Sequence, residues 1–219
     1  MTQQLDRPHV WRPGTTPQAG PPLLLLHGTG GDETSLTYLH AALAPEAPIL
    51  SPRGTVQENG MNRFFRRLAE GVLDEADLTR QTHELAAFLL AAQEAYGVRR
   101  WVAVGFSNGA NIATALLLHH PDPLAAVIAI AAMPPYRRLP ARLPAAARRA
   151  LVVNGADDPL VSDAMTNTLV SQLRAVGTAV ELIRHPGGHE VPDGLLPTLA
   201  AFVRRASNST AHSTRVVTE

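Results

Sequence analysis

Apolar residues occur along the chain in two alternating arrangements, which predict a mostly parallel β-sheet covered by helices on both faces. Short apolar runs bounded by turn residues are typical of buried strands. Longer stretches between them repeat their apolar positions with helical spacing. The predicted strands are Pro22–His27, Ala47–Leu50, Arg100–Gly105, Leu124–Ala131, Ala150–Asn154 and Ala179–Arg184, with an edge strand around His9–Arg12.

The helical stretches differ in how much of their surface is apolar. From Leu85 to Tyr96 the apolar residues form one stripe, and Gly97 is placed to end that helix. The stretch from Gly109 to Leu118 is apolar nearly all round, which predicts a helix at the centre of the molecule. Two further helices are expected, one around Met165, Leu169 and Leu173 with Ser162 as its cap, and one from about Val191 to Val203.

Two stretches lack a clear period. Residues 52–76 look like a long connection that could overhang a site, and residues 133–149, rich in Pro and Arg, are predicted to loop over the surface. Neither is long enough for a separate cap domain. We therefore expect one domain over residues 1–206 and a disordered polar tail over residues 207–219.

Composition and charge exclude several classes of function. The formal net charge is zero, so a polyanion such as nucleic acid gains no overall attraction. The chain has no cysteine, which excludes disulfides, thiolate metal sites and a cysteine nucleophile. No apolar run is long enough to cross a bilayer, and the N-terminus shows no secretory pattern, so we expect a cytoplasmic protein without membrane insertion.

The strongest chemical signal is the sequence Gly105-Phe106-Ser107-Asn108-Gly109, a G-x-S-x-G motif between a predicted strand and a predicted helix. A nucleophilic serine in this place sits on a sharp, strained turn, and glycines beside it remove β-carbons that would collide there. The new helix also directs its backbone N–H groups at a developing oxyanion. The motif in this context predicts Ser107 as a catalytic nucleophile.

A serine hydroxyl is a weak nucleophile, so it needs a base that is oriented by an acid. After such a turn the acid and then the histidine follow along the chain. Asp158, in a G-x-x-D-P turn, is preferred as the acid, and Asp157 is the alternative. His189, which two glycines precede, is preferred as the base, while His185 is expected to pack at the end of a strand.

The loop after the first long strand reads His27-Gly28-Thr29-Gly30-Gly31-Asp32. Its glycines let the backbone N–H of Thr29 face the same point as that of Asn108, which predicts an oxyanion hole. The alternative is a phosphate-binding loop, although the sequence matches neither usual phosphate-loop pattern. Because His27 precedes the serine, we expect it to be structural rather than the base.

Together, 26-LHGTGGD-32, 105-GFSNGA-110, 155-GADDP-159 and Gly188-His189 resemble the phospholipase/carboxylesterase group of α/β-hydrolases, which includes acyl-protein thioesterases. The stretch from Pro52 to Arg67 is similar to a bacterial branch that contains quinone- and hydroquinone-stress hydrolases. The resemblance covers about Leu23 to Phe202. It implies the α/β-hydrolase fold, with Ser107, Asp158 and His189 as nucleophile, acid and base.

The resemblance also implies that the amides of Thr29 and Asn108 bind the oxyanion. The thioesterases usually have Gln where this chain has Asn108, which casts doubt on a thioester substrate more than on catalysis. Phe64 and Phe65 could form an apolar wall of the acyl pocket, and Arg63 could meet an anionic leaving group. Core packing of the phenylalanines and a solvated arginine are equally compatible with the sequence.

These observations predict a serine carboxylesterase that cleaves small, short-acyl esters through an acyl-enzyme, with no metal and no organic cofactor. The partner is then a small-molecule ester rather than nucleic acid, with a homodimer left open. A thioesterase or lysophospholipase is the alternative within enzymes. An inactive binding protein on the same scaffold is the alternative outside them, because a fold alone does not establish activity.

Overall fold

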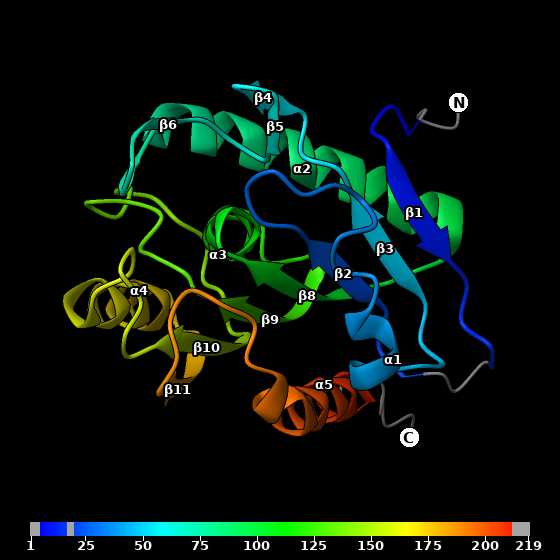
Figure 1. Ribbon diagram of the computed structural model, residues 1–219. Coiled ribbons are helices and arrows are strands. Elements are labelled where there is room, and N and C mark those ends of the chain that lie inside the picture. The colour runs from blue at the N-terminus through cyan, green and yellow to red at the C-terminus, as the bar shows by residue number, and fades with distance from the viewer. Residues whose placement is uncertain (1–4, 17–19, 212–219) are drawn as a thin grey trace, which may run out of the picture.

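A seven-stranded sheet forms the centre of the computed structural model, which describes residues 5–16 and 20–211, the last five by backbone alone (Figure 1). Its order is β1-β3-β2-β8-β9-β10-β11. All neighbours pair in parallel except β1 and β3 at one edge. The strands are β1 His9–Arg12, β2 Leu23–Leu26, β3 Ile49–Pro52, β8 Trp101–Phe106, β9 Leu124–Ile130, β10 Arg149–Gly155 and β11 Ala179–His185.

Helices cover both faces of the sheet, as the sequence predicts. The helices are α1 Leu39–Leu43, α2 Glu75–Tyr96, α3 Asn108–His119, α4 Asp163–Ala175 and α5 Leu196–Ala211. Along β2 the side chains alternate: Leu24 and Leu26 join the core beneath α2, α3 and α4, whereas Leu23 and Leu25 join the core beneath α1 and α5. In Figure 1 α1 and α5 lie on the opposite side of the sheet from α2 and α3.

Helix ends follow local chemistry. The carboxylate of Asp74 accepts a hydrogen bond from the backbone N–H of Asp77 and caps the start of α2. Gly97 ends this helix with a φ of 67°, a left-handed conformation that glycine adopts without strain. Ser162 accepts from the N–H of Met165 at the start of α4. The predicted stop at Gly97 and the predicted cap at Ser162 are both confirmed.

The C-terminal prediction is wrong in its bounds. A 3₁₀ turn covers Asp193–Leu195, and α5 then continues to Ala211, so residues 207–211 are helical rather than part of a tail. Residues 204–211 contain neither Gly nor Pro, so nothing local interrupts the helix. The rest of the predicted tail, residues 212–219, lies outside the described residues. The short helix α1 was not predicted.

The two stretches that lack a clear hydrophobic period, residues 52–76 and 133–149, contain features that the sequence does not predict. Within residues 52–76 lie two small hairpins, β4 Val56–Glu58 with β5 Met61–Arg63, and β6 Arg67–Ala69 with β7 Val72–Leu73. Residues 133–148 have no helix or strand, but Tyr136 and Ala146 are buried in the core. Tyr136 ties the start of this segment to α2, α3 and α4 through hydrogen bonds with Thr79, His119 and Gln172. Residues 137–145 are mostly exposed, so the predicted surface loop describes the middle of the segment but not its buried ends.

The sheet and its helices account for the described chain without a separate cap domain, since only the two hairpins stand out from this framework. Among the described helices, none has both the length and the apolar composition needed to cross a bilayer. Parallel strands place their carboxyl ends at one edge, and the loops that follow β2, β8, β10 and β11 meet there.

Candidate active site

Ser107 lies on a strained turn between β8 and α3. Its φ of 52° and ψ of −114° are conformations that a non-glycine residue rarely adopts. The turn is this sharp because neighbouring backbone approaches closely: a β-carbon on Gly105 would lie 2.5 Å from the carbonyl oxygen of Gly109. One on Gly109 would collide with the carbonyl of Leu26. The two glycines of the motif are therefore required by packing.

Three side chains from different loops form one hydrogen-bonded chain. Nε2 of His189 lies 2.8 Å from Oγ of Ser107, and Nδ1 of His189 lies 2.8 Å from Oδ2 of Asp158. The Asp158 side chain is fully buried, and the imidazole is 21% exposed. The serine hydroxyl is thus in contact with a base whose other nitrogen faces a buried carboxylate, which is the arrangement that activates a serine.

The carboxylate is held in place by backbone. Oδ1 of Asp158 accepts hydrogen bonds from the N–H groups of Leu160 and Val161, at 2.8 and 3.1 Å. This leaves Oδ2 directed at the imidazole. The acid and histidine loops are also joined, because the N–H of Asp157 donates to the carbonyl of Gly187. The acid therefore has little freedom to turn away from His189.

The structure distinguishes the preferred acid and base from the alternatives that the sequence left open. The Asp157 side chain is exposed, whereas Asp158 contacts the histidine. His185 is buried at the end of β11, and its Nδ1 accepts from the N–H of Gly187. It packs at the end of the strand, as the sequence predicts.

The two predicted oxyanion donors lie beside the serine. Thr29 and Asn108 line the same pocket as Ser107 and His189. Among the described residues, neither backbone N–H donates a hydrogen bond to another group of the chain. Asn108 begins α3, where the N–H groups of a helix are unpaired and carry partial positive charge. Two N–H groups are thus available to an oxygen above Ser107.

His27 supports the loop that carries Thr29. Its Nδ1 lies 2.7 Å from the carbonyl oxygen of Gly28, and its Nε2 accepts from the N–H of Gly54 at 3.0 Å. Only a neutral ring with its proton on Nδ1 satisfies both contacts. Burial lowers the pKa of His27, which favours that neutral form. The residue joins two loops and does not line the pocket at Ser107, as expected from its position in the chain.

The side chain of Arg63 is buried, and it binds neighbouring loops as well as lining the pocket at Ser107. It is 4% exposed, its Nε donates to the carbonyl of Phe65, and its Nη1 donates to Oγ1 of Thr29 at 2.8 Å. Glu58 lies 3.5 Å from the guanidinium, and burial lowers the pKa of Arg63. The predicted contact with a leaving group stays a proposal, whereas the alternative of a solvated arginine is wrong because the hairpin β4–β5 buries the side chain.

Phe64 and Phe65 are fully buried in the core formed with α2 and α3, and neither lines the pocket at Ser107. The interpretation as an acyl-pocket wall is therefore wrong, and core packing accounts for both rings. The side chain of Asn108 fixes this segment, because its Oδ1 accepts from the N–H of Phe64 at 2.7 Å. The asparagine thus joins the serine turn to the segment that follows β5.

The pocket above Ser107 is small and partly polar. Its volume is about 70 Å³, and the serine, His189 and Thr29 line it together with polar groups from the hairpins and α3. These polar groups are Arg63, Arg67, Glu70 and Asn111. A space of this size has room for only a small group beside the serine.

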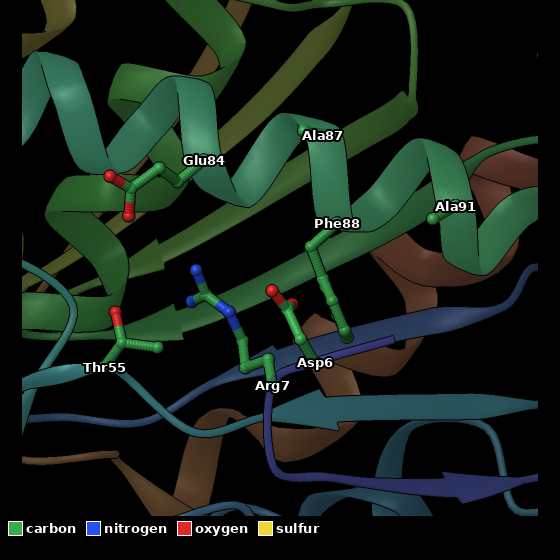
Figure 2. Close-up of a pocket in the computed structure, with 7 residues that line it drawn as sticks. All are labelled: Asp6, Arg7, Thr55, Glu84, Ala87, Phe88 and Ala91. Carbon is green, nitrogen blue, oxygen red and sulfur yellow. The ribbon is translucent and has the colours of Figure 1, made fainter. Parts of the chain in front are cut away.

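A larger cavity of about 410 Å³ lies between the segment before β1 and helix α2, and none of these catalytic candidates lines it (Figure 2). Arg7 reaches into this region between Glu84 and Thr55, above the ring of Phe88. The described residues contain no group of three His, Asp or Glu side chains placed to hold a metal ion.

Comparison with known proteins agrees with this geometry. Residues 21–208 match the family described as the alpha/beta hydrolase fold. The chain belongs to the α/β-hydrolase family. It is 41% identical over 186 residues to a Bacillus subtilis protein named "Putative hydrolase MhqD", covering 84% of this chain and 90% of that one. The predicted fold and family resemblance are confirmed.

Two solved carboxylesterases resemble this α/β-hydrolase along most of its length. The enzyme from Bacillus cereus is 38% identical with a TM-score of 0.86, covering 92% of this chain and 95% of that chain. The enzyme from Mesorhizobium loti is 30% identical with a TM-score of 0.73, covering 84% and 87%. This chain is therefore a hydrolase of the α/β fold with carboxylesterase-like neighbours.

Several residues around the site of this α/β-hydrolase were not found from the sequence. Asn111 lines the pocket, and its Oδ1 accepts from the N–H of Met133. It lies one helical turn after Ser107 in an otherwise apolar helix, which is a signal that could have identified it. Arg67 and Leu160 carry no comparable signal, because their place depends on how distant loops pack.

Proposed function

We propose that this hydrolase is a serine carboxylesterase that cleaves small esters through a covalent acyl-enzyme. The observation that carries the proposal is the unbroken chain from Ser107 Oγ through His189 to Asp158, with 2.8 Å at each contact. Its resemblance to two carboxylesterases supports ester substrates. No other group of the described chain combines a strained serine with a base and a buried acid.

In the first half of the reaction, Ser107 Oγ attacks the ester carbonyl carbon while His189 Nε2 takes the hydroxyl proton. Asp158 keeps the other proton on Nδ1 and stabilises the imidazolium. The negative charge that forms on the carbonyl oxygen is bound by the N–H groups of Thr29 and Asn108. The bond to the alcohol oxygen then breaks, and His189 returns the proton to the departing alcohol.

In the second half, a water molecule takes the place of the alcohol. His189 Nε2 removes a proton from that water, and the resulting hydroxide attacks the acyl carbon bound to Ser107. A second tetrahedral intermediate collapses, the proton passes back to Oγ, and the carboxylic acid leaves. The residues are then in their starting state, since every proton taken by His189 has been returned.

The size of the pocket indicates a short acyl group. A space of about 70 Å³ beside Ser107 suits a short acyl group better than a long fatty chain. This favours a short-chain esterase over a lysophospholipase. The same proton transfers would cleave a thioester, so the sulfur analogue of each ester belongs in the substrate panel.

The test is turnover of p-nitrophenyl esters by the wild type and by Ser107→Ala. We expect the wild type to prefer acetate and butyrate over longer chains, and the variant to lose turnover while keeping its circular dichroism spectrum. Equal rates for the two proteins would reject the serine mechanism. Wild-type protein that turns over neither esters nor thioesters would favour the inactive binding protein instead.

A further inference from the structure

A second hollow adjoins the catalytic pocket on the other side of the Thr29 loop. It has a volume of about 370 Å³ and lies between the segment that leads into α1 and the residue Val191. Leu36, Tyr38 and Phe106 form its apolar surface, and glycines at 28 and 31 leave it open. Because no charged side chain lines it, this hollow, which we name the Tyr38 groove, suits an uncharged apolar group.

The Tyr38 groove is continuous with the reacting atoms through shared residues. Thr29 lines both the groove and the pocket at Ser107. Phe106 directly precedes the serine, and its ring lies 5.3 Å from the imidazole of His189. Val191 follows that histidine by two residues. A group bound in the groove would therefore lie next to the base that donates a proton to the departing alcohol.

The pocket at Ser107 and the Tyr38 groove differ in size and lining, and this difference indicates which part of an ester each would bind. The pocket at Ser107 is small and partly polar, with charged side chains in its lining, whereas the groove is larger, mostly apolar and without a charged side chain, its polar lining being Thr29 and Ser35 beside the phenol of Tyr38. The alcohol must leave before water attacks the acyl-enzyme, so it belongs in the space with the wider exit. The acyl group stays bound to Ser107 throughout and fits the small pocket.

Tyr38 is placed to contact a ligand in the groove. Its side chain is 54% exposed, so it is accessible to a ligand. Partial burial and the charge of Asp193 raise the pKa of its phenol, so the ring presents a neutral hydroxyl and an apolar face. An aromatic ring that enters the groove would contact Tyr38, Phe106 and Val191, which line it.

We propose that the Tyr38 groove binds an aromatic alcohol portion of the substrate, which makes short-chain aryl esters the preferred substrate class. The proposal rests on the esterase function above. Tyr38 then determines specificity for the alcohol, and the pocket at Ser107 determines specificity for the acyl group.

A pair of reversed esters tests this assignment. In 2-naphthyl acetate the ring is in the alcohol, and in ethyl 2-naphthoate it is in the acyl group. We expect Tyr38→Ala to lower the ratio of kcat/KM for 2-naphthyl acetate over ethyl acetate by about threefold to tenfold, the size of one lost aromatic contact. Tyr38→Phe should keep the ratio, because it keeps the ring.

Leu90→Ala is the matched control, since Leu90 is also an exposed apolar side chain but lies on α2. It should leave the ratio unchanged. A ratio unaffected by Tyr38→Ala would overturn the proposal. So would a Tyr38→Ala effect confined to ethyl 2-naphthoate, because the groove would then bind the acyl part.

A binding measurement separates this inference from the esterase proposal. Fluorescence titration of the Ser107→Ala protein with 2-naphthol requires no chemistry. We expect the Kd to rise threefold to tenfold when Tyr38→Ala is added to that variant. If 2-naphthol binds and the binding depends on Tyr38, the groove proposal is supported even when no ester is cleaved. If esters are cleaved but 2-naphthol binding does not depend on Tyr38, the groove proposal is rejected and the esterase proposal stands.

Discussion

The guanidinium of Arg63 donates a hydrogen bond to the hydroxyl of Thr29 across 2.8 Å, and so joins the hairpin β4–β5 to the loop that carries a proposed oxyanion donor. Asn62 adds to this junction, because its side chain donates to the carbonyl of Gly31 and its own carbonyl accepts from the N–H of Gly30. The hairpin therefore sets the conformation of the oxyanion loop.

Arg63→Lys should lower kcat by about tenfold with little change in KM, because the lost contact orients a donor that acts in the transition state. Thr29→Val keeps the backbone N–H and removes the hydroxyl, so it should cause a similar loss. The double variant should be no worse than either single one. A rise in KM confined to esters with an anionic alcohol would instead indicate that Arg63 contacts the substrate.

Asp158→Asn should lower kcat by about 10⁴, the size expected when the catalytic histidine is left in the wrong tautomer. The amide fills the same space but no longer holds the proton on Nδ1 of His189. Asp157→Asn is the control, because that side chain is exposed, and its kcat should change by less than about threefold. Steady-state kinetics on p-nitrophenyl acetate measures both, and reversed effects would assign the acid to Asp157.

Gly109→Ala should destabilise the protein by about 3 kcal/mol, since the added methyl collides with the backbone at Leu26 and His27. Gly194→Ala is its control, because a β-carbon there meets nothing within 4 Å, and it should change stability by less than about 0.5 kcal/mol. Urea unfolding measures both. Equal stability of the two variants would show that β2 and α3 are not in close contact.

His27 should make the protein less stable in mild acid. Its pKa in the folded state is lowered by burial, so the unfolded chain binds a proton more readily than the folded one. The stability that neutral His27 contributes is fully present above the pKa of the unfolded chain, about 6.5. It is lost as the pH falls from there towards the lower pKa of the folded state, by at most about 1.4 kcal/mol per pH unit.

His27→Gln isolates that effect, because glutamine keeps a donor and an acceptor but does not titrate. His119 and His120, whose pKa values are also lowered by burial, remain in both proteins and cancel in the comparison. Urea unfolding at pH 7.5 and at pH 5.5 should show a smaller loss for the variant. An equal loss would mean that His27 is not held neutral in the folded protein.

The serine turn could be predicted from sequence because its signals are local. A buried strand, two glycines and an apolar helix lie within about twenty residues of Ser107. Asp158 and His189 could be placed because loops after parallel strands meet at one edge of the sheet. Their contact in the structure follows from the strand order β8-β9-β10-β11.

The surroundings of the serine depend on contacts that no local pattern contains. Arg63 is buried where the hairpin β4–β5 folds against the distant loop after β2, and Phe64 is buried in the core formed with α2 and α3. The polar composition after Val203 predicts an earlier end for α5 than the structure shows, because residues 204–211 contain no Gly or Pro to break the helix. Distant packing and element ends were thus the parts that sequence reasoning missed.

Labelling with a fluorophosphonate, followed by mass spectrometry of the digested protein, tests the central claim most directly. The wild type should gain one phosphonyl group on the peptide that contains Ser107, and His189→Ala should label at least a hundredfold more slowly because Oγ loses its base. Unlabelled wild type, or an adduct on another residue that persists in Ser107→Ala, would contradict an active nucleophile at this position.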